Sequence, residues 1–337
     1  MAKAHSPPSM GMNALDRSVA YVPNETDLRV VQSLSSELLP VISVVIPSFN
    51  QASFLRATIE SVLLQRYPHV EVFVADGGST DGSLAILAEY AEKCPGYFRF
   101  VSERDHGQAN AVNKAIEATH GELIAWINSD DVYVADAFWK IACFFHFNRC
   151  ALIVYGRNRY VDLHLVPTMD YPASWSAQLR EQRRRMMHLC LPPQPSLFFR
   201  RVVFNTLGKL TENPALDYEL WLRWQQDCPF YFIDDYLSLS RLHPKAKSLT
   251  GERQLYHDIC NLVHRSYWIV PYNWTRNLAY YEAYGNLWMT GKTFPITRTI
   301  RRRGLFYWIY LNLLWGPRGL LDIARHFRDT LIESLRT

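Results

Sequence analysis

Two neighbouring aspartates, Asp130 and Asp131, follow a continuous apolar run at residues 123–127. Such a run is typical of a strand covered on both faces, and in open α/β sheets ligands collect beyond the carboxyl ends of such strands. Adjacent carboxylates suit Mg²⁺ or Mn²⁺, which bind one or two carboxylates and take their other ligands from water and phosphate groups. The structural alternative is a helix start, because Ser129 and Asp130 are favourable N-cap residues.

A third aspartate, Asp217, lies where a helix is expected, because Leu216, Leu220 and Trp224 fall on one helical stripe. A carboxylate in the first turn of a helix stabilises the helix dipole. By itself, this pattern therefore indicates a structural role for Asp217.

Alternating strands and helices must position these residues. We expect strands at residues 42–46, 70–75, 98–102 and 123–127, separated by helices at 50–65, 83–93 and 108–119. This alternation predicts a parallel sheet with right-handed crossovers. The polar loops that follow the strands then meet at one edge of the sheet, where Asp76, at the end of a buried strand, could accept hydrogen bonds from a base or ribose.

Four segments at this edge carry a resemblance to a known family. They read VVIPSFN (44–50), DGGSTDGS (76–83), DHGQANAVN (105–113) and NSDD (128–131), and in this order they closely resemble the family 2 glycosyltransferases with a GT-A fold. The resemblance covers roughly residues 41–249. It implies a Rossmann-like, mostly parallel sheet flanked by helices. Many members have two acids where this chain has Asp76 and Gly77, and an acid where it has Asn128.

The resemblance also implies roles for individual residues. Asp130 would coordinate a Mg²⁺ or Mn²⁺ ion that bridges the diphosphate of a nucleotide-sugar donor. Asp217 would be the general base that takes the proton of an acceptor hydroxyl, and a single displacement would invert the anomeric carbon. The implied donor contacts are Pro47, Ser48, Asn50, Asp76, Gly78, Gln108, Asn113, Asn128, Asp131, His243 and Lys247. For His243 and Lys247, an exposed basic loop is an equal alternative.

The composition of the whole chain is that of a globular protein, with 337 residues, 48% hydrophobic and 20% charged. A formal charge of +4 predicts no nucleic-acid partner. We expect a mobile tail at residues 1–39, a GT-A domain at 40–250 and a helical extension at 251–337. Within the domain, residues 40–132 would bind the nucleotide sugar and residues 133–250 the acceptor. Six cysteines without a C-x-x-C pair, and no secretory signal, indicate reduced thiols and a cytoplasmic protein.

The segment 298–323 combines arginines with an apolar, aromatic run that Gly316 and Pro317 stop well short of a bilayer span. This pattern suits a helix in a membrane interface, which would place the protein at the inner face of the cell membrane, near a lipid-linked acceptor. A saccharide is the other acceptor we consider. The alternative for the segment is a core helix with a charged start.

Two other functions compete with glycosyl transfer. A NAD-dependent dehydrogenase is disfavoured, because no G-x-G-x-x-G follows the first expected strand. A non-catalytic nucleotide-sugar-binding or scaffold protein of the same fold remains an alternative, since Asn128 and Leu216 replace acids that are frequent in the family. Measured turnover distinguishes an enzyme from a scaffold.

Overall fold

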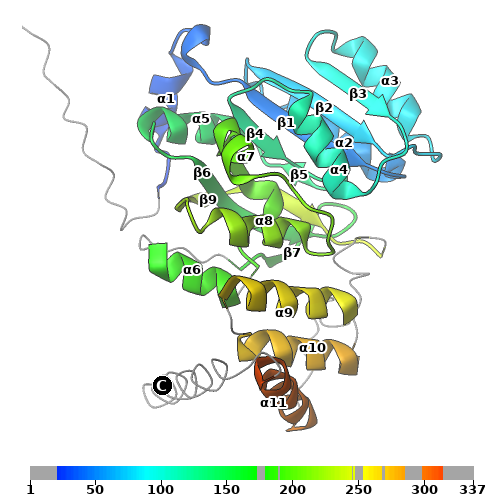
Figure 1. Ribbon diagram of the computed structural model, residues 1–337. Helices are drawn as coiled ribbons and strands as arrows, with labels where there is room; N and C mark the ends of the chain where they lie inside the picture. Colours follow the sequence, from blue (N-terminus) through cyan, green and yellow to red (C-terminus); the bar gives the residue numbers. More distant parts are fainter. Residues whose placement is uncertain are drawn as a thin grey trace, which may run out of the picture.

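The computed structural model describes residues 21–172, 179–188, 190–244, 246, 253–267, 270–284 and 298–313. Figure 1 shows an α/β domain with a group of C-terminal helices below it. One sheet organises the domain, and its strands are β1 (Ile42–Ser48), β2 (Val70–Asp76), β3 (Phe98–Ser102), β4 (Leu123–Trp126), β5 (Val132–Tyr133), β6 (Ile153–Val161), β7 (Pro167–Asp170), β8 (Leu197–Arg200) and β9 (Phe230–Arg241).

The sheet is parallel in its first four strands and mixed beyond them. Its strand order is β3-β2-β1-β4-β8-β6-β9-β5, with β7 paired to β6. The first four strands in this order are parallel to one another, whereas β8 runs antiparallel to both β4 and β6. The loops after β1, β2, β3 and β4 therefore lie at one edge, as the sequence predicts. This arrangement confirms the GT-A fold class.

Helices cover both faces of the sheet. Those of the domain are α1 (Glu25–Gln32), α2 (Ala52–Leu63), α3 (Ser83–Lys93), α4 (Gln108–Glu117), α5 (Ala137–Phe147), α6 (Leu179–His188), α7 (Arg201–Leu207) and α8 (Leu216–Trp224), with short 3₁₀ turns η1 (Ser36–Leu38) and η2 (Gln194–Ser196). Because strand side chains alternate between faces, Val45 packs with α4, α7 and α8, whereas Val44 and Ile46 pack with α2, α3 and α5. All seven residues of β1 are buried, which explains its continuous apolar sequence.

The segment from Tyr21 to Leu39, predicted as part of a mobile tail, packs on the domain. The backbone N–H of Tyr21 donates to the carbonyl of Phe232 in β9 at 3.1 Å. Asn24 caps α1 by accepting the N–H of Asp27 at 2.8 Å, and Val31 is fully buried against the face that α5 covers. Residues 1–20 lie outside the described part of the chain.

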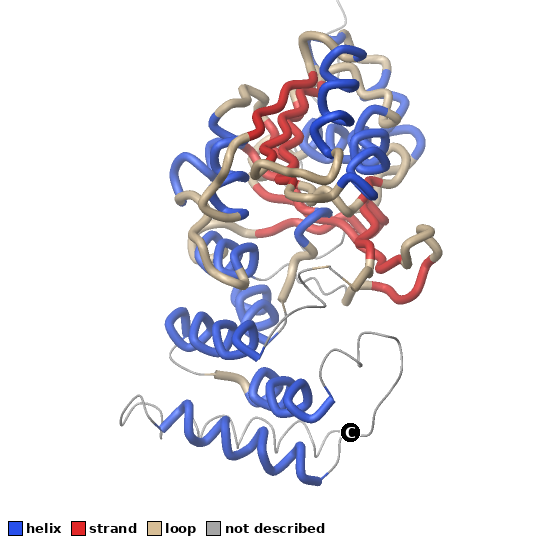
Figure 2. Tube along the Cα trace, turned by 90° about the vertical axis from the view of Figure 1, so that its right-hand side faces the viewer, coloured by secondary structure: helices blue, strands red, loops and turns tan. Residues whose placement is uncertain are grey.

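Three further helices, α9 (Arg253–Tyr267), α10 (Tyr272–Tyr284) and α11 (Arg298–Leu313), make up the described part of the predicted C-terminal extension. Figure 2 shows them stacked below the sheet. Trp274 of α10 packs on Tyr218 of α8, with 5.7 Å between ring centroids. Gly304 lets α11 approach α10 closely, because a Cβ there would lie 2.8 Å from Cα of Arg276. Among the described helices, none is both long and apolar enough to cross a membrane.

Candidate active site

Asp76, at the carboxyl end of β2, shapes the loop that follows it. Its side chain is buried, and Oδ2 accepts hydrogen bonds from the N–H of Gly78 at 3.1 Å, the N–H of Ser79 at 2.8 Å and the hydroxyl of Ser102 at 2.7 Å. Oδ1 accepts the hydroxyl of Ser79 at 2.5 Å. Gly78 has φ +84°, a backbone conformation that favours glycine. The predicted donor residue Asp76 thus fixes the turn around it.

The loops after β1 and β2 hold each other in place. Asn50, with φ 53°, donates its N–H to the hydroxyl of Ser79 at 2.7 Å, and its Oδ1 accepts the N–H of Thr80 at 2.9 Å. The preceding residues Pro47 and Ser48 are buried in β1. Three predicted donor residues therefore lie directly beside the turn that Asp76 organises.

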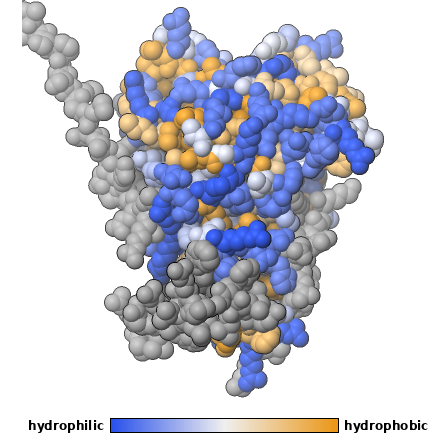
Figure 3. Space-filling view, in the orientation of Figure 1, coloured by the Kyte–Doolittle hydropathy of each residue, from blue (hydrophilic) through white to orange (hydrophobic). Residues whose placement is uncertain are grey.

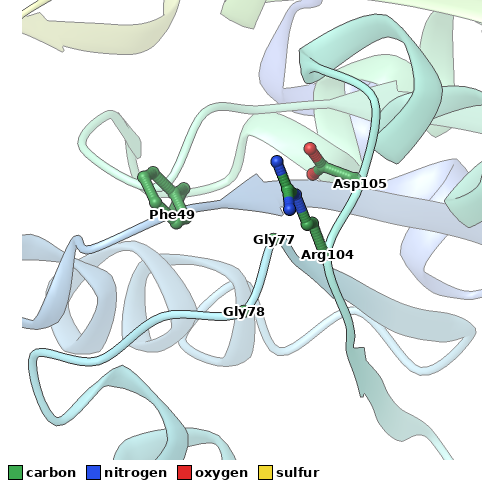
Figure 4. Close-up of a pocket in the computed structure, with 5 residues that line it drawn as sticks. All are labelled: Phe49, Gly77, Gly78, Arg104 and Asp105. Atoms are coloured by element: carbon green, nitrogen blue, oxygen red, sulfur yellow. The ribbon is translucent and has the colours of Figure 1, made fainter.

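A cavity of about 380 Å³ opens at this edge, lined by Phe49, Gly77, Gly78, Arg104 and Asp105. Figure 4 shows Phe49 on one side of Gly77, and Arg104 and Asp105 on the other. A Cβ on Gly77 would lie 2.9 Å from Oδ2 of Asp105 and 3.3 Å from the ring of Phe49. The Asp105 carboxylate thus takes the space next to Asp76 that a side chain at position 77 would otherwise fill.

Asn128, the second residue after β4, is held by amide groups on both sides. Its Oδ1 accepts from Nε2 of Gln108 at 2.8 Å, and its Nδ2 donates to Oε1 of Gln194 at 3.0 Å. Gln194 is buried in η2 and donates in turn to the carbonyl of Trp126 at 2.5 Å. The network fixes the start of the loop at residues 128–131 and joins it to α4.

The two neighbouring aspartates have different environments. Oδ2 of Asp130 lies 3.0 Å from Nε2 of His243, and the Asp130 side chain keeps 18% of its surface exposed. Asp131 is buried, and its Oδ1 accepts the N–H of Arg241 at 3.0 Å. Burial raises the pKa of Asp131 well above its ordinary value, and the charge of Asp130 adds to this. Asp130 therefore faces the loop edge, whereas Asp131 anchors the end of β9.

Arg241 and His243 both pack on the ring of Phe54. The Arg241 guanidinium lies 4.8 Å above the ring centroid, and the His243 ring lies 4.5 Å from it. The pKa of Arg241 is lowered, because the effect of burial is larger than the opposing effect of the charges of Asp130 and Asp131. Lys247, which the sequence places in the same loop, lies outside the described residues.

The site offers a divalent ion one carboxylate and one imidazole, from Asp130 and His243. The described residues contain no group of three or more His, Cys, Asp or Glu side chains that could hold a metal alone. Mg²⁺ and Mn²⁺ sites often have few protein ligands, because water and substrate phosphates complete the coordination. The residues present therefore fit an ion that binds together with a diphosphate.

Asp217 lies in the first turn of α8, on the sheet face that α4 also covers. Its Oδ1 accepts the N–H of Tyr218 at 2.8 Å. Burial raises the pKa of Tyr160, and the charges of Cys190, Asp131 and Asp217 add to the increase. Tyr171 packs on Tyr160 with 5.5 Å between ring centroids.

Two residues of the site, Gln194 and Arg241, were missed by the sequence analysis, and both contact the loop at 128–131. Arg104 and Asp105, which line the cavity, belong to one of the polar loops that the expected sheet places at this edge. Gln194 and Arg241 lie 66 and 110 residues from their partners, and a local pattern contains no signal for such contacts.

The mostly parallel sheet, with its polar loops at the carboxyl edge, has the GT-A fold. Residues 43–208 match the model of Glycosyl transferase family 2. The chain is therefore an enzyme of the glycosyltransferase class, as the sequence predicts.

Related sequences support this assignment. An uncharacterized glycosyltransferase of Rickettsia typhi is 27% identical over 64% of this chain and 68% of its own length. The putative teichuronic acid biosynthesis glycosyltransferase TuaG of Bacillus subtilis is 35% identical over 35% of this chain and 46% of its own length. The match to TuaG thus spans about half of that relative.

Solved structures share the fold. Staphylococcus aureus TarS 1–349 in complex with UDP-GlcNAc aligns with a TM-score of 0.55 at 16% identity, covering 80% of this chain and 81% of that one. The mannosyltransferase PcManGT of Pyrobaculum calidifontis, in complex with GDP-Man and Mn²⁺, aligns with a TM-score of 0.51 at 14% identity, covering 90% and 86%. At these identities the likeness concerns the fold.

Proposed function

We propose that the protein is a metal-dependent, inverting glycosyltransferase that moves a sugar from a nucleoside-diphosphate sugar to an acceptor hydroxyl. The observation that carries this proposal is the pairing of Asp130 with His243 at 3.0 Å, at the edge where the cavity beside Gly77 also opens. The cavity suits a planar base next to Phe49, and the Asp130–His243 pair suits the metal and diphosphate. The UDP-GlcNAc and GDP-Man complexes of the structural neighbours are consistent with such a donor.

Asp130 and His243 would hold the metal ion, Mg²⁺ or Mn²⁺. When bound, the ion neutralises the charge that develops on the departing nucleoside diphosphate. Asp131 would not bind it directly, because its carboxylate is buried against the backbone of Arg241. It holds the end of β9, and hence His243, beside Asp130. The guanidinium of Arg241 adds a positive charge behind the two acids.

Asp217 would accept the proton of the attacking hydroxyl. Its side chain is partly exposed in the first turn of α8, while Leu216, Tyr218, Leu220 and Trp221 around it are buried, which gives the helix a fixed position. A carboxylate at this position can act as the base. Attack from the side opposite the leaving diphosphate inverts the anomeric carbon.

The acceptor is proposed to be a growing polysaccharide or its lipid-linked precursor. The relative TuaG carries the name of a polymer-synthesising enzyme, and this supports the proposal at the level of the family. The rings of Tyr160 and Tyr171 near Asp217 provide flat apolar surfaces of the kind on which sugar rings pack.

A thermal-shift panel tests the proposed donor class. UDP, GDP, dTDP and CMP are each added with Mn²⁺ and with a chelator. A ligand at about 100 times its dissociation constant stabilises the native state by about 2.7 kcal/mol, which shifts the unfolding midpoint visibly. We expect one nucleoside diphosphate to give a shift that requires the metal, whereas CMP is the monophosphate control. A wild-type protein that shifts with none of them, in the presence of Mn²⁺, would contradict the proposal.

We also propose a membrane contact through α11. Arg301, Arg302 and Arg303 are exposed on this helix, and so are Leu305, Phe306 and Ile309, of which Phe306 is 64% exposed. The opposite side, with Ile300 and Trp308, is buried. Figure 3 shows hydrophilic and hydrophobic residues next to each other at this lower end of the molecule. Arginines beside exposed apolar side chains fit the interface of an anionic membrane, where a lipid-linked acceptor would lie.

Flotation with vesicles tests the membrane contact. We expect the full chain to float with phosphatidylserine vesicles and to stay at the bottom with neutral ones. Replacing Arg301, Arg302 and Arg303 by serine should weaken binding roughly 100-fold, since each arginine near an anionic surface contributes about 1 kcal/mol. Replacing Arg29, an exposed arginine of α1, is the matched control. If the triple variant floats as well as the wild type, α11 is not the contact.

A further inference from the structure

Helix α4 connects the donor side of the site with the loop that leads to Asp217. At its first residue, Gln108 donates to Oδ1 of Asn128 at 2.8 Å, next to the proposed metal ligand Asp130. In its middle, Asn113 bonds to the backbone of Leu210: Nδ2 donates to the Leu210 carbonyl at 2.9 Å, and Oδ1 accepts the Leu210 N–H at 3.0 Å. The backbone of one residue thus engages both ends of the Asn113 amide.

A second contact fixes the same loop to the start of α4. Oε1 of Glu212 accepts the N–H of Asn110 at 2.8 Å. The carboxylate also lies directly over Gly107, because a Cβ there would come within 2.6 Å of Oε2. The first N–H groups of a helix have no partner within the helix, and a negative charge beside them is favourable. Glu212 therefore holds the loop at 208–215 against the N-terminal end of α4.

The other side of the loop is attached to α8, the helix that carries Asp217. Arg223 donates from Nη1 to the carbonyl of Leu207 at 2.8 Å and from Nη2 to the carbonyl of Lys209 at 2.7 Å. Leu210 is buried in the core that α4 and α8 share. Hydrogen bonds thus lead from Asn128 through α4 and the loop to the helix of the proposed base.

We infer that Asn113 and Glu212 are positioning residues, which set the place of Asp217 relative to the donor loop at residues 128–131. The inference rests on the proposed function and deepens it. A base must lie within hydrogen-bond reach of the hydroxyl, and a displacement of about 1 Å can reduce the rate about 100-fold. The sequence predicts a donor contact for Asn113, whereas its amide is engaged by Leu210 on the side of the acceptor half.

Three possible roles of Asn113 predict different experimental results. If Asn113 contacts the donor, its substitution should raise the dissociation constant of the nucleoside diphosphate. A positioning residue would leave that constant unchanged, lower kcat, and loosen the loop at 208–215. A merely structural residue would lower the unfolding midpoint and reduce donor binding and kcat together.

The experiment compares Asn113→Leu, Asn113→Asp and Glu212→Gln with the wild type. Lys114→Gln is the matched control, because Lys114 lies on the same helix and pairs with Glu103, away from the loop. Hydrogen–deuterium exchange of peptides covering 208–217 is measured in the free protein, and calorimetry gives the UDP or GDP dissociation constant with Mn²⁺. Steady-state assays with the matching nucleotide sugar and with water as acceptor give kcat.

For Asn113→Leu we expect exchange at 208–217 to accelerate at least about tenfold, kcat to fall about 10- to 100-fold, and the diphosphate dissociation constant to stay within about twofold. Asn113→Asp keeps an acceptor for the Leu210 N–H and should give intermediate exchange. Wild-type exchange at 208–217 in Asn113→Leu would overturn the inference, as would a tenfold weaker diphosphate affinity with unchanged kcat. The exchange measurement does not depend on enzyme activity. If the wild type shows no turnover, the proposed function is contradicted, whereas the exchange result still tests the contacts of Asn113.

Discussion

Asp217→Asn is expected to reduce glycosyl transfer by about 10²- to 10⁴-fold, the usual contribution of a general base. The asparagine has the same shape, and its Oδ1 can still accept the N–H of Tyr218 that Asp217 accepts at 2.8 Å. It cannot take the proton of the acceptor hydroxyl. Helix α8 should therefore keep its place, while the chemical step is lost.

The measurement is kcat with the nucleotide sugar that matches the best diphosphate of the panel, together with the dissociation constant of that diphosphate. We expect the dissociation constant to be unchanged. Asp227→Asn is the matched control, because Asp227 is an exposed aspartate shortly after the same helix. A variant Asp217→Asn with the wild-type rate would remove Asp217 from the mechanism.

Asp130→Ala is expected to abolish the metal-dependent part of donor affinity. Loss of groups that merely support a metal ligand often costs about 10- to 100-fold in affinity or activity, so loss of a carboxylate ligand should cost at least as much. Calorimetry of UDP or GDP binding with Mn²⁺ and with a chelator measures the difference. In the variant, the two dissociation constants should be equal within error.

Two controls make this result specific. Asp227→Ala removes an exposed aspartate elsewhere and should leave the metal dependence intact. His243→Ala should reduce it as well, because the imidazole lies 3.0 Å from the Asp130 carboxylate. Equal affinity with and without chelator in the wild type would refute metal dependence as a whole. A metal-dependent affinity that persists in Asp130→Ala would refute only the role of this residue.

The first half of the domain, residues 40–132, followed from the sequence because its signals are local. Continuous apolar runs predict buried strands, and the strands β2 and β3 begin at the predicted residues, Val70 and Phe98. The helix expected at residues 50–65 begins later, at Ala52, because Asn50 adopts φ 53° to bond with the neighbouring loop. Boundaries of this kind depend on contacts with other segments.

The second half of the domain, residues 133–250, and the completion of the site depend on contacts between distant parts of the chain. His243 meets Asp130 across 113 residues, and Glu212 meets Asn110 across 102. Sheet order decides these contacts, since the short antiparallel β8 separates β4 from β6 and brings η2 beside Asn128. The residues themselves suggested Asp130 as a metal ligand, and the resemblance to a family supplied the catalytic role of Asp217. It gave no information on Gln194, whose partners become visible only in three dimensions.

Because Gly77 lies close to Asp105, the residue type at one of these positions restricts the residue type at the other. A side chain at position 77 requires the Asp105 carboxylate to shift, because a Cβ at 77 would lie 2.9 Å from its Oδ2. A relative with an acid at position 77 is therefore expected to have a smaller or displaced side chain at position 105. The two positions are therefore expected to vary together among the closest relatives of this chain.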